Sequence, residues 1–408
     1  MPNDVIAPEE AAVTPVTPQR ALMQRFITSW TGLLIIAASA AGCRAQRPSG
    51  PAAHSSTPAP IDGAVRVETV ASGLRNPWGL AILPDGRMLV TEKSGTLRVV
   101  EQNGKVSSPL TGVPPVDASG QGGLLDVALD PGFASNRLVY LSYSEPGPNG
   151  TAGTAALRAR LGATGLEDVK VIYRQDPKVV GGNHFGSRIA FAPDGKVFIT
   201  QGERFAYRDQ AQNLNSLLGK VVRLNPDGTV PQDNPFVGKS GARPEIWSYG
   251  HRNVEAAAIH PETGKLWTIE HGAMGGDELN HPEAGKNYGW PVITYGLDYN
   301  GSRIGIGAVK DGMEQPVYYW DPVIAPSGMM FYTGDKFPQW RNNIFVGGLA
   351  SNVLVRLVLE NGRVTKEERY LHDLHERIRD VQQGLDGYIY VITDNNSGRI
   401  LRLTPASK

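Results

Sequence analysis

Cysteine is nearly absent from this chain of 408 residues, which contains Cys43 and no other. A single cysteine excludes an intrachain disulfide framework and a cysteine-rich zinc or iron–sulfur site. An excess of one charge is absent too, since 40 lysine and arginine residues balance 40 aspartate and glutamate residues. This balance gives no electrostatic attraction to nucleic acid or to an anionic membrane surface, so we expect no nucleic-acid partner.

The N-terminal region lacks a hydrophobic run long enough for a membrane span. The apolar run at residues 33–38 is too short, but Arg20 and Arg25 precede it and small residues follow it up to Cys43. We interpret residues 1–43 as a leader and secretory signal peptide whose end resembles a bacterial lipoprotein cleavage box. The predicted location is therefore outside the cytoplasm, periplasmic or in the cell envelope as a lipoprotein anchored through Cys43. Plain secretion with an incidental cysteine is the alternative.

Two further segments follow the signal peptide. Residues 44–63 are rich in proline, serine and alanine, and their low apolar content predicts a disordered tether. We expect residues 64–408 to form one domain. With 48 glycines and 30 prolines in the chain and many short strand-like runs, the composition favours an all-β, turn-rich fold.

A sequence unit recurs through this domain. Each copy has an apolar pair, a Pro-Asp-Gly turn or a variant of it, a strand, a polar break and a second strand. The copies occupy residues 79–101, 124–145, 187–204, 255–272, 328–362 and 379–405. Six such units predict a six-bladed β-propeller, and residues 65–70 are expected to close the ring by adding a strand to the last blade.

Polar residues precede the first strand of four units, where the strands of a propeller converge on the central channel. They are Gln121, His184, the pair Arg252 and Asn253, and the pair Arg377 and Arg379. Converging at one mouth, they would form a pocket suited to a planar polyanion. Each also has a structural explanation: His184 as a satisfied core histidine, the arginine pairs as contacts between blades.

The stretch from 249 to 291 has a second feature. A strand at residues 265–270 delivers oxygen ligands into a glycine-rich loop that contains Glu270, His271, Asp277 and Glu278. This pattern predicts a hard-cation site, although an acidic turn exposed to solvent is the commoner origin of such a pair. The chain has no nucleophile elbow, phosphate loop or dinucleotide fingerprint.

The motifs LRNPWGLAILPDGRMLVTEK, GQGGLLDVALDP, GGNHFGSR, GHRN, GDELN, NYGWP and ERIRDV occur in this order on successive units. Together they resemble the soluble quinoprotein aldose dehydrogenases of the glucose/sorbosone type. Members of that family are six-bladed propellers of the periplasm that depend on calcium and pyrroloquinoline quinone (PQQ). The similarity covers residues 65–404.

The resemblance implies a role for each matching residue. His184 would be the general base that takes the proton of the sugar's anomeric hydroxyl, and Arg252 would stabilise the negative charge that hydride transfer creates on PQQ. Further cofactor contacts would come from Gln121, Asn253, Tyr299, Arg377 and Arg379. The carbonyls of Gly272 and Ala273 would hold the calcium ion that binds PQQ. A second, structural calcium ion would lie at Glu278 and Tyr288, with Asp277 as a neighbour.

Two positions depart from the family pattern. Residues 348–351 read Gly-Leu-Ala-Ser, so Ala350 stands where a lysine is expected near the cofactor, and Arg204 stands where the glucose-specific branch has an amide. We therefore predict a broad-specificity aldose sugar dehydrogenase, an oxidoreductase that forms lactones. One alternative is a calcium-dependent lactonase-like hydrolase; it is disfavoured because the channel is expected to be lined with arginines and to contain few acids. The other alternative is a non-catalytic binding propeller. No electron acceptor and no oligomeric state is predicted.

Overall fold

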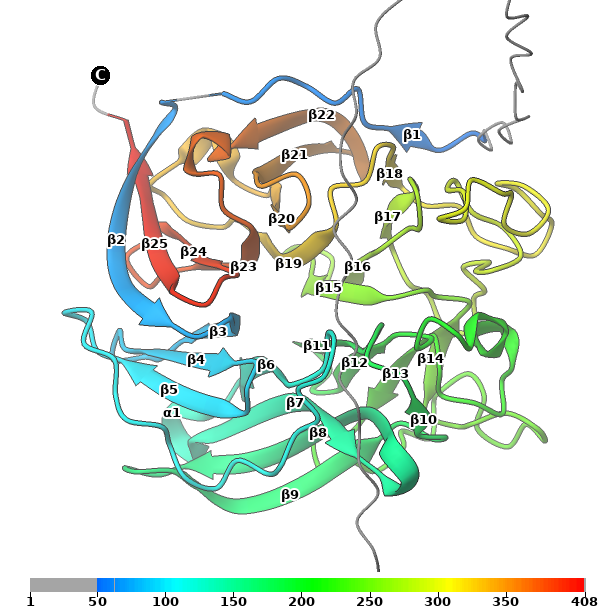
Figure 1. Ribbon diagram of the computed structural model, residues 1–408, viewed down its shortest axis with the longest axis horizontal. Helices are drawn as coiled ribbons and strands as arrows, with labels where there is room; N and C mark the ends of the chain where they lie inside the picture. The colour runs from blue at the N-terminus through cyan, green and yellow to red at the C-terminus, as the bar shows by residue number, and fades with distance from the viewer. Residues whose placement is uncertain (1–49, 62, 407–408) are drawn as a thin grey trace, which may run out of the picture. The chain divides into compact units, whose positions relative to one another are not determined.

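Six β-sheets are arranged around a central channel in the computed structural model, which describes residues 50–61 and 63–406 (Figure 1). The predicted signal peptide and Cys43 lie outside the described residues. The only α-helix in the described part is the short α1 (Phe133–Asn136). The fold is an all-β six-bladed propeller, as the repeats predict.

The first three sheets follow one another along the chain. From the channel outwards, the first sheet has the strands β3 (Pro77–Ile82), β4 (Met88–Glu92) and β5 (Thr96–Val100). The second has β6 (Leu124–Leu129), β7 (Leu138–Pro146) and β8 (Thr151–Leu161), and both β9 (Leu166–Arg174) and β10 (Val179–Val180) pair with β8. The third has β11 (Gly186–Phe191), β12 (Val197–Gln201), β13 (Lys220–Leu224) and β14 (Ile246–Tyr249).

The last three sheets complete the ring. The fourth sheet has the strands β15 (Val254–Ile259), β16 (Leu266–Glu270), β17 (Asp277–Asn280) and β18 (Tyr318–Trp320). The fifth has β19 (Pro326–Phe331), β20 (Ile344–Gly348), β21 (Leu354–Glu360) and β22 (Arg363–Tyr370). The sixth has β23 (Ile378–Gln383), β24 (Ile389–Thr393) and β25 (Gly398–Pro405). Short 3-10 turns lie between strands at Pro148–Gly150, Arg208–Gln212, Pro338–Trp340 and His372–Leu374.

The Asp-Gly turns predicted from the repeats join the first two strands of three blades. Gly86 and Gly195 both have positive φ, 82° and 77°, and each donates its amide to the carbonyl three residues earlier. Glycine suits these positions because a side chain disfavours the left-handed region. Such tight turns set the register of the hairpins and so fix where each innermost strand begins.

The ring closes between the two ends of the domain. Strand β2 (Val65–Leu74) pairs antiparallel with β25, from Val65 opposite Pro405 to Leu74 opposite Gly398. The predicted closing strand is confirmed, and it continues four residues beyond the predicted end at Val70. Because the closing strand and the last sheet come from opposite ends of the domain, their hydrogen bonds tie the first blade to the last.

The predicted tether behaves differently from the expectation where the structure describes it. Strand β1 (Ala53–His54) pairs in parallel with the outer strand β18, and the Ser55 amide donates to the Tyr319 carbonyl at 2.9 Å (Figure 1). An edge strand offers unpaired backbone groups, so a segment of low apolar content can still bind it. The prediction of a disordered tether over residues 44–63 therefore fails for this part.

Apolar side chains fill the space between neighbouring blades. One buried cluster joins Leu89 and Leu97 of the first blade to Leu141 and Leu157 of the second, and others join the later blades in the same way. Packing on both faces of each sheet holds the innermost strands in a fixed ring. The ends of these strands thus form a rigid support for side chains at the channel mouth.

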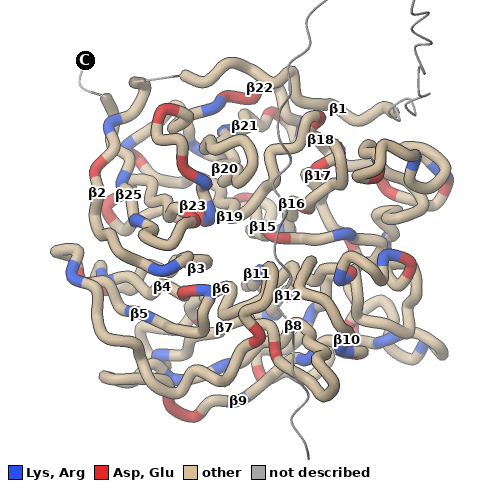
Figure 2. Tube along the Cα trace, viewed as in Figure 1, with Lys and Arg blue, Asp and Glu red and all other residues tan. Residues whose placement is uncertain are grey.

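Charged residues of both signs are spread over all the blades (Figure 2). No helix among residues 50–61 and 63–406 combines the length and the apolar character that crossing a bilayer requires.

Candidate active site

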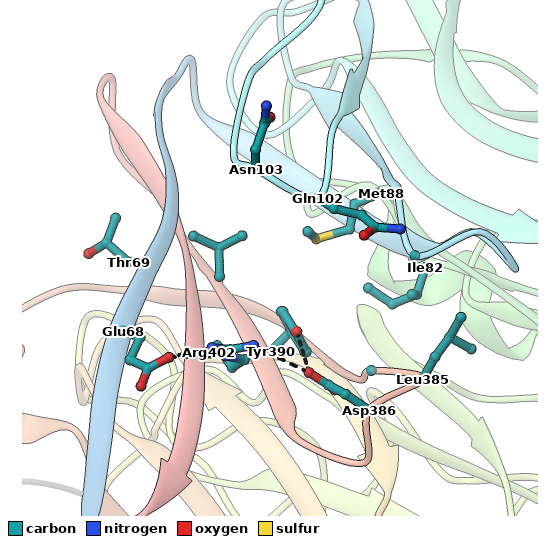
Figure 3. Close-up of a pocket in the computed structure, with 13 residues that line it drawn as sticks. Glu68, Thr69, Ile82, Met88, Gln102, Asn103, Leu385, Asp386, Tyr390 and Arg402 are labelled. Atoms are coloured by element: carbon teal, nitrogen blue, oxygen red, sulfur yellow. Dashed lines mark hydrogen bonds and ion pairs between the residues drawn. The ribbon is translucent and has the colours of Figure 1, made fainter.

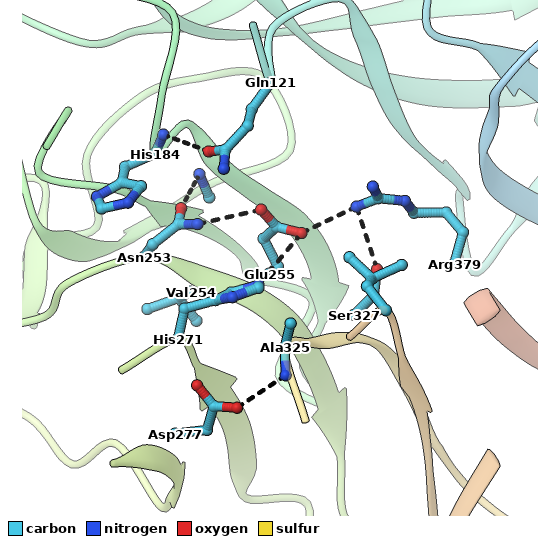
Figure 4. A network of polar contacts seen from close by, with 12 residues as sticks. Gln121, His184, Asn253, Val254, Glu255, His271, Asp277, Ala325, Ser327 and Arg379 are labelled. Atoms are coloured by element: carbon cyan, nitrogen blue, oxygen red, sulfur yellow. Dashed lines mark hydrogen bonds and ion pairs between the residues drawn. The ribbon is translucent and has the colours of Figure 1, made fainter. Parts of the chain in front are cut away.

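The predicted polar residues gather where the innermost strands begin. The structure connects Gln121, His184, Asn253 and Arg379, which come from four blades, in one polar network at that end of the channel (Figure 4). Residues 122–123, 185, 253 and 377 immediately precede or open β6, β11, β15 and β23. The equivalent positions of the repeats are therefore brought together, as the propeller interpretation predicts.

His184 is buried and is held from two directions. Its Nδ1 lies 2.9 Å from Oε2 of Glu203, and its backbone amide donates to Oε1 of Gln121 at 2.7 Å. A carboxylate at Nδ1 favours the tautomer that carries its proton there, which leaves Nε2 as an acceptor. None of the described residues lies within hydrogen-bond distance of His184 Nε2. The side chain is thus arranged to receive a proton.

Burial lowers the pKa of His184 below its usual value, and the hydrogen bond that its Nδ1 donates to Glu203 opposes this shift only in part. The imidazole is therefore neutral at neutral pH, the state that a base requires. The backbone of His184 has a φ of 55°, in the left-handed region. A non-glycine residue is uncommon there, and such conformations often mark functional sites.

Glu203 is a site residue that the sequence reasoning missed. It follows β12, and its carboxylate is buried against His184. The next blade contains a similar contact, because His251 and Glu270 are also 19 residues apart and bind through Nδ1. The two pairs are not at matching positions of the repeat, since Gly186 pairs with Gln201 where Val254 pairs with Glu270. A position-by-position comparison of the units therefore gives no signal for Glu203.

Asn253 and Glu255 connect the histidine loop to the arginines. Asn253 accepts the Gly186 amide at 2.9 Å and donates to Glu255 Oε1 at 3.0 Å, and Glu255 Oε2 lies 3.0 Å from a guanidinium nitrogen of Arg379. Burial raises the pKa of Glu255, but His271, Arg379 and Asn253 outweigh it, and the net pKa is lowered. Glu255 is therefore an anion fixed between blades four and six.

Arg377 and Arg379 both donate to one oxygen of Asp394, at 3.0 and 2.7 Å. They lie on the same side of the strand, as their spacing predicts. The expectation that the channel contains few acids is wrong, because Glu255 and Asp394 pair with these arginines at the mouth. Farther along the channel, Arg188 pairs with Asp126 and Asp380 in the same manner. A buried guanidinium requires such partners.

Arg252 is bound differently from the other arginines of the mouth. Its guanidinium donates to the carbonyls of His271 and Gly272, at 3.2 and 2.5 Å, and to the Tyr299 hydroxyl at 3.1 Å. It also lies over the Trp290 ring, 5.2 Å from the centroid. Within the described part of the chain no carboxylate lies within ion-pair distance of this guanidinium. Arg252 is therefore available to pair with an anionic ligand.

Glu270 and Asp277 are buried and Glu278 is half-buried, so the acids of this loop are not a solvent-exposed turn. Asp277 accepts the amides of Gly272, Ile324 and Ala325 at 2.8 to 2.9 Å. Glu278 lies beside Asn280, 3.3 Å from its amide nitrogen. Burial and the neighbouring Glu270 raise the pKa of Glu278 well above its usual value. A cation at Glu278 would offset that repulsion.

Tyr288 and Ala273 lie in the same region. The Tyr288 ring stacks on His251, with centroids 4.9 Å apart, and its hydroxyl donates to the His281 carbonyl at 2.6 Å. His251 in turn binds Glu270 at 2.8 Å. Tyr288 therefore reaches the acids through His251. Ala273 is buried beside Gly272. Among the described residues, no three His, Cys, Asp or Glu side chains converge as a metal site.

The two departures from the family pattern also have defined surroundings. Arg377 donates to the Leu349 carbonyl at 3.3 Å, so a cation already lies beside Ala350. Arg204 is buried and donates to the carbonyls of Asn183, Ala152 and Gly181. Burial lowers its pKa to about 10.

Two cavities lie away from these residues. One, of about 470 Å³, lies between the last blade and the first and contains the ion pair of Glu68 with Arg402 at 2.6 Å (Figure 3). The other, of about 500 Å³, is lined by the far ends of the innermost strands, at the opposite mouth. None of the predicted site residues lines either cavity. The candidate active site is therefore the mouth that holds His184.

Known proteins match this chain over the region that contains these site residues. The model of the Glucose / Sorbosone dehydrogenase family matches residues 74–402. Aldose sugar dehydrogenase YliI of Escherichia coli strain K12 is 48% identical over 84% of this chain and 93% of that protein. Quinoprotein glucose dehydrogenase B of Acinetobacter calcoaceticus is 27% identical over 80% of this chain and 85% of that protein.

Solved structures share the fold over the same region. The crystal structure of the soluble aldose sugar dehydrogenase from Escherichia coli, in the apo-form, matches with a TM-score of 0.82 and 48% identity, covering 84% of this chain and 99% of that one. The PQQ-bound form of the aldose sugar dehydrogenase from Streptomyces coelicolor matches with a TM-score of 0.69 and 30% identity, covering 85% and 99%.

Proposed function

The chain belongs to the glucose and sorbosone dehydrogenase family of oxidoreductases, and we propose that it oxidises the anomeric hydroxyl of aldose sugars to lactones, with PQQ as cofactor and calcium as bound ion. The observation that carries this proposal is the arrangement of His184: Nδ1 fixed by Glu203, Nε2 free, and the unpaired guanidinium of Arg252 at the same mouth. A base beside an unpaired cation suits a reaction that separates a proton from a hydride.

The residues at the mouth fit PQQ chemically. Arg252 has no carboxylate partner among the described residues, its Nε is buried without a hydrogen bond, and the Nε of Arg379 is in the same state. These donors match the carboxylate and carbonyl oxygens of a planar polyanion. Arg252, Asn253, Arg377 and Arg379 would hold the cofactor, with Gln121 and Tyr299 beside them. When bound, PQQ supplies the acceptor for the hydride of the sugar's anomeric carbon.

His184 supplies the proton transfer. Its Nε2 would take the proton of the anomeric hydroxyl as the hydride departs, so that no cationic carbon has to form. Glu203 holds the ring in the accepting tautomer and stabilises the imidazolium that results. General-base assistance of this kind is worth roughly two to four powers of ten in rate.

Calcium fits two places in this loop region. The carbonyls of Gly272 and Ala273 are hard oxygen donors, and a calcium ion there would displace the hydrogen bond from Arg252 to Gly272. The second place is Glu278, where the amide oxygen of Asn280 is buried without a hydrogen bond. An unpartnered oxygen beside buried Glu270 and half-buried Glu278 suits a divalent cation, with Asp277 as a neighbour and Tyr288 behind His251.

We also propose export and a lipid anchor, which rest on the residues before Arg44 alone. Small residues lead up to Cys43, and a diacylglycerol there would hold the enzyme near an electron acceptor in the membrane. Mass spectrometry of the mature protein is the test. A lipid-modified N-terminal cysteine supports the anchor, and an unmodified Cys43 refutes it.

Reconstitution tests the function. The mature chain is purified without cofactor, PQQ and calcium are added separately and together, and dye reduction is followed with several aldoses. We expect turnover only when both are present, and its loss in His184→Ala. Lactone hydrolysis without PQQ would instead indicate the lactonase alternative, and sugar binding with no turnover would indicate a binding propeller.

A further inference from the structure

Phe205 is an aromatic residue in an unusual position. The residue is 47% exposed, and its backbone has a φ of 62°, directly after Arg204 with a φ of 66°. Two successive left-handed residues other than glycine are unfavourable, because the side chain crowds the backbone. An exposed phenylalanine contributes little to the core. Folding alone therefore gives no reason for this residue here.

The neighbours of Phe205 fix it in this conformation. Arg204 is buried and donates to three carbonyls of residues 152–183, while its guanidinium lies 3.8 Å from the centroid of Phe185. The amide of Phe205 donates to Oε2 of Glu203, the same oxygen that holds His184. The backbone turn that orients the general base thus also directs the Phe205 ring outwards.

The ring lies at the reaction centre. Its centroid is 5.3 Å from that of the His184 imidazole, with the two planes at 84°, and 6.2 Å from that of Tyr299. Tyr299 is also exposed, at 57%, and its hydroxyl binds Arg252. Phe205 therefore connects the base on one side with the arginine that faces the cofactor position on the other.

We propose that Phe205 is a sugar-binding residue, whose ring packs against the apolar C–H groups of the aldose ring and holds the anomeric hydroxyl toward His184. This inference deepens the proposed function and rests on it. An aldose in its ring form has hydroxyls at its rim and C–H groups on its faces, so an aromatic ring can bury apolar area without breaking the sugar's hydrogen bonds. Phe205 then determines affinity for cyclic aldoses, while His184 determines the rate.

The test uses the full mature chain with PQQ and calcium. In Phe205→Ala and Phe205→Gly we expect KM for D-glucose to rise about tenfold, equivalent to about 1.4 kcal/mol, with kcat within about threefold of the starting value. Phe205→Tyr keeps the ring and should restore KM. The matched control is Leu385→Ala, an exposed residue at the opposite mouth (66% exposed), which should leave KM unchanged.

The midpoint of thermal unfolding, Tm, distinguishes a sugar-binding role of Phe205 from a structural one, because removal of a structural residue would lower Tm. Glycine accepts the left-handed conformation, so Phe205→Gly should leave Tm unchanged or raise it. An unchanged KM in Phe205→Gly, or a Tm that falls while KM stays constant, overturns the inference. Calorimetric titration with D-glucose and with its lactone makes the inference testable without turnover. Absence of turnover in the starting protein refutes the proposed function, whereas sugar binding that Phe205→Gly does not weaken refutes only the role of Phe205.

Discussion

Two histidine–glutamate pairs, each separated by 19 residues, lie in neighbouring blades. His184 lies 2.9 Å from Glu203, and His251 lies 2.8 Å from Glu270. The second imidazole is closed on its other side, because Nε2 contacts Ser248 Oγ at 2.9 Å and the ring stacks on Tyr288. The first has a free Nε2. Two neighbouring blades therefore each contain a histidine–glutamate dyad, and the surroundings of Nε2 decide which one can act as a base.

Substitution of each histidine by alanine is the strongest test of this comparison. His184→Ala should lower kcat by roughly 10² to 10⁴, because general-base assistance is lost. PQQ affinity should change little, whereas Tm should fall because the buried carboxylate of Glu203 loses its imidazole partner. Steady-state kinetics with added PQQ and calcium, together with thermal unfolding, measure both effects. Turnover within threefold of the starting enzyme would remove His184 from the mechanism.

His251→Ala is the matched variant and should act on stability. It leaves the buried carboxylate of Glu270 without its imidazole partner and opens a cavity beside Tyr288. We expect a loss of about 2–3 kcal/mol in the free energy of unfolding, with kcat per folded molecule within about threefold. A large loss of kcat at unchanged stability would contradict the distinction between the two pairs.

Glutamine substitutions extend the comparison to the acids. In Glu203→Gln the amide oxygen can still accept from Nδ1 of His184 and from the Phe205 amide, so the tautomer is kept, but the negative charge that stabilises the imidazolium is lost. We expect kcat to fall on the order of 10², less than the 10⁴ or so seen when the same change is made in a serine-protease triad. Glu270→Gln should lower Tm and leave kcat nearly unchanged. Equal kinetic effects of the two variants would show that the dyads are not specialised.

Calcium tests the acidic loop that lies behind the second pair. At about 100 times its dissociation constant, a calcium ion that binds only the folded state adds about 2.7 kcal/mol of stability. We expect millimolar calcium to raise Tm of the cofactor-free protein, and Glu278→Gln to remove most of that rise. Glu203→Gln should retain it in full. A calcium response that survives in Glu278→Gln would place the stabilising ion elsewhere.

Several features of this molecule were predictable because they depend on local pattern. The repeats predict the blades, and the residues before each first strand predict the mouth. Glu203 was missed because it lies two residues beyond the end of β12, where the next unit has Gly272, so the repeat gives no signal for it. The partners of Arg379 were missed for another reason: Glu255 and Asp394 reach it across the channel and from a neighbouring hairpin, and no local pattern encodes such contacts. Strand β1 was missed because backbone pairing needs no apolar side chains.

The pH dependence of turnover gives the smallest and most specific effect. Burial lowers the pKa of His184, so kcat/KM should decline on the acid side with a midpoint below 6.5. Glu203 acts in the opposite direction, raising this pKa, so Glu203→Gln should move the midpoint to lower pH, whereas Glu270→Gln should leave it in place. The same shift affects stability. Because the folded state favours the neutral imidazole, the contribution of His184 to the free energy of unfolding is present above pH 6.5 and is lost as the pH falls through the lowered pKa. A midpoint above 6.5, or one that moves upwards in Glu203→Gln, would contradict the assignment of His184 as the titrating base.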